Sequence, residues 1–104
     1  MISLLMLLAA NNVFVTGNEL YGQCTGTSEE QLICLSYITG VADGMTVTQV
    51  VYEPSPGFAC IPDGVNRQQV RDIVVKYMTN NPESRHMHAG AVIIVALKNA
   101  FPCK

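Results

Sequence analysis

Charged side chains are scarce in this 104-residue chain. Asp, Glu, Lys and Arg together make up 13% of it, about half of the roughly 25% that is usual in soluble domains. Six basic residues against eight acidic ones leave a formal net charge of −2. Proteins that bind nucleic acid need clustered basic side chains to neutralise phosphates. We therefore expect no nucleic-acid partner.

Several patterns typical of enzymes and metal proteins are also missing. Zinc sites usually combine two ligand pairs that are close in sequence, as in C-x-x-C, and the four cysteines form no such pair. Neither a G-x-S-x-G nucleophile elbow nor a glycine-rich phosphate loop is present. These absences argue against an enzyme, and we expect no cofactor, metal or catalytic residue.

No apolar run is long enough for a stable membrane anchor. The opening run Met1–Ala10 (MISLLMLLAA) has the length of the apolar region of a signal peptide, well short of the roughly 20 residues that span a bilayer. We interpret residues 1–12 as a signal peptide or its remnant. A retained N-terminal helix, on the apolar pattern alone, is the alternative. Residues 13–104 are predicted to form a single domain.

The first half of this domain has the apolar spacing and start signals of two helices. The first helix is expected within Val13–Cys24, with its start signal at Thr16–Glu19. The second should begin at Ser28, because Gln31 follows it at capping-box spacing. The second helix has core-facing positions at three- and four-residue spacing, namely Leu35, Ile38, Val41, Ala42, Met45 and Gln49/Val50.

Two glycines, Gly40 and Gly44, lie four residues apart on one face of the second expected helix. Each glycine costs a helix about 1 kcal/mol relative to alanine. We expect the close approach of a neighbouring helix to compensate for this cost. The alternative is that the two glycines simply leave the helix frayed.

Two more helices are predicted after a loop at 53–64, which is rich in proline and glycine. Asn66 and Gln69 have capping-box spacing for the third helix, and Asn81 with Pro82 fits the start of the fourth. Val92–Val95 could instead form a strand, but continuing helical spacing favours a helix. The buried positions are expected at Val70, Ile73, Val74, Tyr77, Met78, Ala89, Val92, Ile93, Ala96, Leu97, Ala100 and Phe101. The predicted fold class is all-α, a compact bundle of about four helices.

The four cysteines fall near expected helix boundaries and can pair in three ways. If the helices run up and down, the end of the first helix meets the start of the second, and the loop before the third meets the end of the fourth. This topology predicts the disulfides Cys24–Cys34 and Cys60–Cys103. Structural disulfides imply an oxidising compartment, so we expect an exported protein.

A few other polar and aromatic side chains are candidates for function. His86 and His88 are two residues apart, so on a helix they point in different directions and cannot readily bind one ion; we expect one at the surface and one partly packed. Asp43 could accept a hydrogen bond from Tyr37 or an arginine, or could face water. Phe58 could be an interface anchor, although we favour a position covering the core near Cys60.

An ordered set of short motifs runs through the chain. They are Gly17-Asn18-Glu19-Leu20 with Cys24; Cys34-x-x-Tyr37-Ile38-x-Gly40-Val41-x-Asp43-Gly44; Cys60-x-Pro62-x-Gly64-Val65 with Gln69; Pro82-Glu83-x-Arg85-His86; and Ala96-Leu97 with Ala100-Phe101-Pro102-Cys103. This set resembles the Rap/Tai family, which comprises small periplasmic immunity proteins (resistance-associated proteins and type VI amidase immunity proteins).

The resemblance implies a compact helical domain that binds a cognate peptidoglycan amidase of a type VI secretion system and blocks its active site, often as a homodimer. On that interpretation the partner-binding surface is the loop 53–64 with the adjacent helix ends, and our candidate contact residues are Glu53, Ser55, Phe58 and Asp63. The alternative function is a periplasmic acid-stress chaperone of the HdeA type or another periplasmic protein-binding module.

Overall fold

Four α-helices form the domain in the computed structural model, which describes residues 14–52 and 58–104. They are α2 (Gly17–Cys24), α3 (Ser28–Val51), α4 (Arg67–Asn80) and α5 (Ala89–Ala100), and a short 3₁₀ turn, η1 (Pro82–Ser84), lies between the last two. Over these residues the only β pairings are two isolated bridges. The prediction of an all-α bundle of about four helices is confirmed, including a helix rather than a strand at Val92–Val95.

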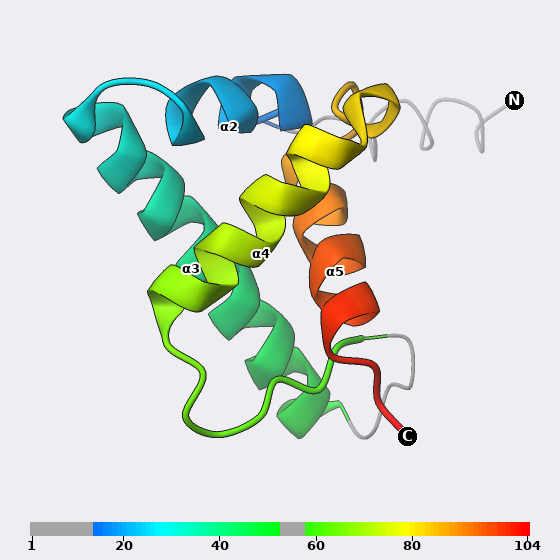
Figure 1. Ribbon diagram of the computed structural model, residues 1–104. Coiled ribbons are helices and arrows are strands. Elements are labelled where there is room, and N and C mark those ends of the chain that lie inside the picture. The colour runs from blue at the N-terminus through cyan, green and yellow to red at the C-terminus, as the bar shows by residue number, and fades with distance from the viewer. Residues whose placement is uncertain (1–13, 53–57) are drawn as a thin grey trace, which may run out of the picture.

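The long helix α3 lies along one side of the molecule (Figure 1). Helix α4 crosses in front of it, α5 lies on the other side of α4, and α2 lies across one end of the bundle (Figure 1). Each of the four helices contacts the other three. This arrangement leaves one face of α3 pointing away from the rest of the domain.

The core is formed by apolar side chains at helical spacing from all four helices. Most of the predicted positions are buried, because each helix turns one apolar stripe towards the others. At the Gln49/Val50 position, Gln49 is half-buried but Val50 is 78% exposed, so the assignment of Val50 to the core is wrong. Ala100 is exposed as well. The buried core residues are Leu20, Cys34, Ile38, Ala42, Met45, Ala59, Val70, Val74, Met78, Ala89, Val92, Ile93, Ala96 and Leu97.

The predicted starts of α2, α3 and α4 are confirmed, but the cap of α3 lies one residue earlier than predicted. Thr16 caps α2 and Asn66 caps α4, each in a reciprocal capping box. Helix α3 does begin at Ser28, but its cap is Thr27, whose hydroxyl accepts a hydrogen bond from the Glu30 backbone N–H at 3.2 Å. The pKa of the Glu30 carboxyl is lowered, mainly by a hydrogen bond from the Thr27 backbone N–H and to a smaller extent by a hydrogen bond with the Thr27 side chain. The predicted partner Gln31 instead donates to the Gly26 carbonyl.

The predicted start of the last helix is also wrong. Asn81 makes no side-chain cap there; its amide donates to the Tyr77 carbonyl at the end of α4. Pro82 opens only the short turn η1, and α5 begins at Ala89. The chain between them is held against the start of α2, where the Ala89 N–H donates to the Val15 carbonyl at 3.0 Å. Because of this contact between distant segments, α5 begins at Ala89 and not at Pro82.

Gly17 lies at the same crossing and is buried. Its N–H donates to the Met87 carbonyl at 2.7 Å, and a Cβ atom built on it would come within 2.6 Å of the Arg85 carbonyl oxygen. A backbone oxygen cannot swing aside as a side chain can. The first turn of α2 therefore requires glycine at this position.

We expect Gly17→Ala to lower the free energy of unfolding by about 1 to 3 kcal/mol, the usual cost of overpacking, although alanine is the better helix former. Urea denaturation followed by circular dichroism measures the change. Gly22→Ala, in the same helix with open space around the added Cβ, is the matched control and should be neutral or stabilising. Equal effects of the two substitutions would contradict the steric explanation.

Candidate partner-binding surface

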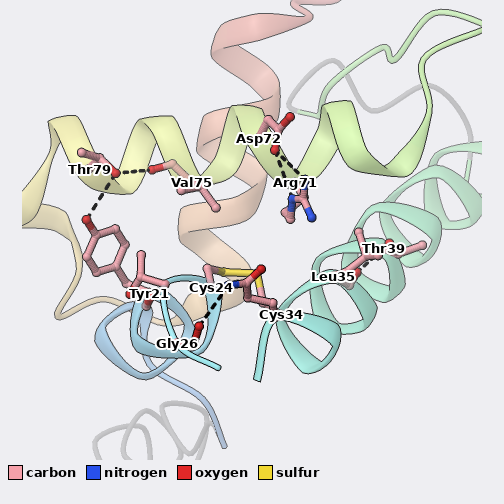
Figure 2. Close-up of a disulfide and its surroundings, with 12 residues drawn as sticks. Tyr21, Cys24, Gly26, Cys34, Leu35, Thr39, Arg71, Asp72, Val75 and Thr79 are labelled. Atoms are coloured by element: carbon pink, nitrogen blue, oxygen red, sulfur yellow. Dashed lines mark hydrogen bonds and ion pairs between the residues drawn. A yellow bond between two sulfur atoms is a disulfide. The ribbon is translucent and has the colours of Figure 1, made fainter. Parts of the chain in front are cut away.

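Two disulfides hold the two ends of the domain. Cys24 pairs with Cys34 and Cys60 pairs with Cys103, each with a Cα–Cα distance of 5.0 Å, as the topology predicted. The first bridge ties the end of α2 to the second turn of α3 (Figure 2). Cys34 therefore lies within a helix, and the expectation that all four cysteines mark helix boundaries is wrong for this residue.

The second disulfide fixes the segment that leads into α4. Ala59 forms a β-bridge with Pro102, and the Cys60 N–H donates to the Phe101 carbonyl at 2.8 Å. Ala59 itself is buried. The segment is thus anchored both by backbone hydrogen bonds and covalently beside the end of α5.

The candidate contact residues lie in different environments. Glu53 and Ser55 are outside the described residues. Phe58 is half-buried and packs against the hydrophobic core, in agreement with the favoured interpretation of its sequence context. Asp63 is exposed and precedes Gly64, whose positive φ of 92° makes the turn. Asp63 is therefore the described candidate that is most accessible to a partner.

A pocket of about 230 Å³ lies between this segment, the middle of α3 and the start of α4. Its lining combines apolar side chains, such as Ile61 and Val65, with the charged Asp43 and Arg67. Asp43 is exposed, as one of the two sequence interpretations expected. Neither Asp43 nor Arg67 has an ion-pair partner among the described residues, where the one salt bridge joins Arg71 and Asp72 at 2.9 Å.

The two histidines lie in different environments, as expected: His86 is exposed and His88 is half-buried. Within residues 14–52 and 58–104, no group of three or more His, Cys, Asp or Glu side chains is placed to hold a metal ion. The same residues include no helix that is both long and apolar enough to cross a membrane. What they do present is an anchored surface segment beside a small pocket.

The contacts that Arg85 makes were not predicted from the sequence. Its guanidinium carbon lies 4.1 Å from the centre of the Tyr21 ring, and its Nε donates to the Met78 carbonyl at 2.9 Å. The Tyr21 hydroxyl also accepts a hydrogen bond from Thr79 at 3.3 Å, as Figure 2 shows. Cation–π contacts of this kind contribute about 0.5 to 1 kcal/mol at exposed sites. Arg85 thus links α2 to the end of α4.

A second unexpected feature is the outward face of α3. Large apolar side chains on it are exposed, namely Leu32, Ile33, Val47, Val50 and Val51. Gly40 and Gly44 are exposed too, with open space above both, so no helix of residues 14–52 and 58–104 makes the close approach that was expected there. Apolar residues all around a helix usually mean that it is covered on every side. The apolar residues on all sides of α3 were therefore the sequence signal that could have identified this surface.

The comparisons with known proteins agree with the resemblance seen in the motifs. A search of curated proteins gave no match. The family model described as Rap1a immunity proteins matches residues 16–103, which include both disulfides and the four helices of the described residues. The chain therefore belongs to the Rap1a immunity protein family.

Proposed function

We propose that this chain is a periplasmic immunity protein that binds a cognate peptidoglycan amidase of a type VI secretion system and inhibits it by blocking its active site. The match to the immunity family over residues 16–103 carries this proposal and favours it over the acid-stress chaperone alternative. Immunity of this kind requires binding only, so the chain would act without catalysis.

The disulfides support the proposed location. Paired cysteines persist in oxidising compartments such as the periplasm, and both bridges lie within the family domain. We assign export to the apolar segment at residues 1–12, which would be removed as a signal peptide.

The proposed contact surface is the loop 53–64 together with the pocket beside it. Within this loop, residues 58–64 are anchored by Cys60–Cys103, so little conformational entropy should be lost when a partner binds them. Asp63 is exposed at its turn, and Arg67 lies at the rim of the pocket. Charged groups at the rim of an interface mainly guide association and select the partner.

The test uses the purified peptidoglycan amidase encoded beside this chain's gene. We expect a stable complex in size-exclusion chromatography, and a stoichiometric loss of peptidoglycan cleavage. Asp63→Lys should raise the Kd about tenfold. Glu83→Lys, an exposed acidic residue in η1, is the matched control and should leave the Kd unchanged. A neighbouring amidase that neither binds nor loses activity would refute the proposal.

A further inference from the structure

Both histidines of this chain lie in the turn before α5. They are His86 and His88, with Met87 between them. The expectation that the two rings cannot readily bind one ion depends on a helix at this place. The chain instead bends at Met87 and is extended at His88, and α5 begins only at Ala89. The opposed directions that a helix gives to residues two apart therefore do not apply here.

A hollow of about 270 Å³ lies at this turn. It is lined by His86, Met87 and His88, together with Ala91 of α5. Met87 is 43% exposed, although a methionine is more often buried. Among residues 14–52 and 58–104, no hydrogen bond uses either imidazole ring. The ring nitrogens are therefore available to a ligand from solvent.

The backbone that carries these side chains is fixed by hydrogen bonds. The Met87 N–H donates to the Ser84 carbonyl at 3.1 Å, and the Met87 carbonyl accepts from the Gly17 N–H at 2.7 Å. His88 forms a β-bridge with Thr16, so the turn lies beside the start of α2 (Figure 1). Because this backbone is already ordered, little conformational entropy is lost when the side chains bind an ion.

The positive charge of Arg85, the preceding residue, is directed elsewhere. Its guanidinium carbon lies 4.1 Å from the centre of the Tyr21 ring, and its Nε donates to the Met78 carbonyl. Arg85 is not among the residues that line the hollow. Its repulsion of a cation bound there is therefore weakened by distance and by solvent.

The types of donor in the hollow determine which ion fits. They are two imidazoles and a thioether, and the lining has no carboxylate. Calcium and magnesium take oxygen ligands, and a structural zinc site needs four ligands. A thioether is a soft ligand that selects Cu(I), and imidazole also suits copper. The set of donors therefore favours Cu(I) over these divalent ions.

We propose that His86, Met87 and His88 form a binding site for Cu(I). The imidazole rings supply two ligands and the Met87 thioether supplies the third. The site lies at the opposite end of the bundle from residues 58–64, which belong to the proposed contact surface (Figure 1). This inference goes beyond the proposed function, because binding of the ion needs no amidase.

The first measurement titrates the full chain, without an affinity tag, with Ag(I) as a redox-inert substitute for Cu(I). Nuclear magnetic resonance follows the ring signals of the only two histidines in the chain and the methionine methyl signals. We expect the signals of His86, His88 and the Met87 methyl group to shift together and to stop changing at one ion per chain. The Kd for Cu(I) is then measured by competition with a chromogenic chelator, with ascorbate as the reductant so that both disulfides stay closed.

Substitutions test each ligand separately. His86→Ala, His88→Ala and Met87→Leu should each raise the Kd for Cu(I) at least about tenfold, an effect seen even for residues that only support a metal ligand. Met87→Leu nearly conserves volume, so its effect reports on the sulfur atom. Glu83→Gln is the control, because Glu83 is exposed in η1 and does not line the hollow; the Kd should not change. Circular dichroism checks that each variant is folded.

Three results would overturn the inference. The first is an Ag(I) titration that shifts one histidine ring or neither. The second is a Met87→Leu variant that binds Cu(I) as tightly as the native protein does. The third is a native protein that binds Zn²⁺ more tightly than Cu(I). None of these results bears on inhibition of the amidase, which is measured separately.

Discussion

Replacing Cys60 and Cys103 together with alanine should lower the free energy of unfolding by about 4 kcal/mol on the chain-entropy model, since this bridge closes a loop over a sequence separation of 43 residues. The total free energy of unfolding of such a domain is about 5 to 15 kcal/mol. The variant should therefore unfold at a much lower urea concentration. It should also release the segment around Ala59 from the end of α5, which amide hydrogen exchange would detect.

The paired control is the Cys24→Ala/Cys34→Ala variant. Its loop spans only 10 residues, which corresponds to about 2.7 kcal/mol. Cys34 is fully buried, so loss of its packing adds to this figure, and hydrogen exchange near Ala59 should stay slow. A Cys60/Cys103 variant as stable as the native protein, or one with unchanged exchange at Ala59, would contradict this account.

Leu97→Ala should have an effect of similar size. Leu97 is completely buried in α5 among side chains from the other helices, and truncating such a leucine removes apolar burial and leaves a cavity. The expected loss is about 2 to 5 kcal/mol, measured by urea denaturation with both disulfides intact.

Val95→Ala is the matched substitution on the same helix. Val95 is 38% exposed, and alanine is the better helix former, so the two effects nearly cancel and we expect a change within about 0.5 kcal/mol. If Val95→Ala were as destabilising as Leu97→Ala, the side chains of α5 would not be oriented as described.

Local signals in the sequence were sufficient for most of the fold. The capping boxes at Thr16 and Asn66 could be recognised because cap and partner are three residues apart. The start of α3 shows the limit of such signals, because Thr27 with Glu30 and Ser28 with Gln31 are overlapping boxes, and local sequence does not choose between them. The late start of α5 depends on Val15, more than seventy residues away, and was not predictable from the sequence around Pro82.

The functional surface was less accessible to sequence reasoning than the fold. Helical spacing identified the inner stripe of α3, but Val47 and Val51 on the opposite side are just as apolar. Spacing alone cannot say whether such side chains face a core, a partner or water. Arg85 is one of the residues of the family motifs. Its contact with Tyr21 could not be predicted, because it depends on the packing of α2 beside the end of α4.

The order of the disulfides along the chain has a consequence for biogenesis. Each cysteine pairs with its neighbour in sequence, so the two loops are consecutive and do not overlap. On the proposed export route, translocation from the N-terminus would release Cys24 and Cys34 first, and their thiols could join before the rest arrives. Cys60 would then find only Cys103 left to react with. Oxidation in order of emergence would yield the native pairing without reshuffling by an isomerase.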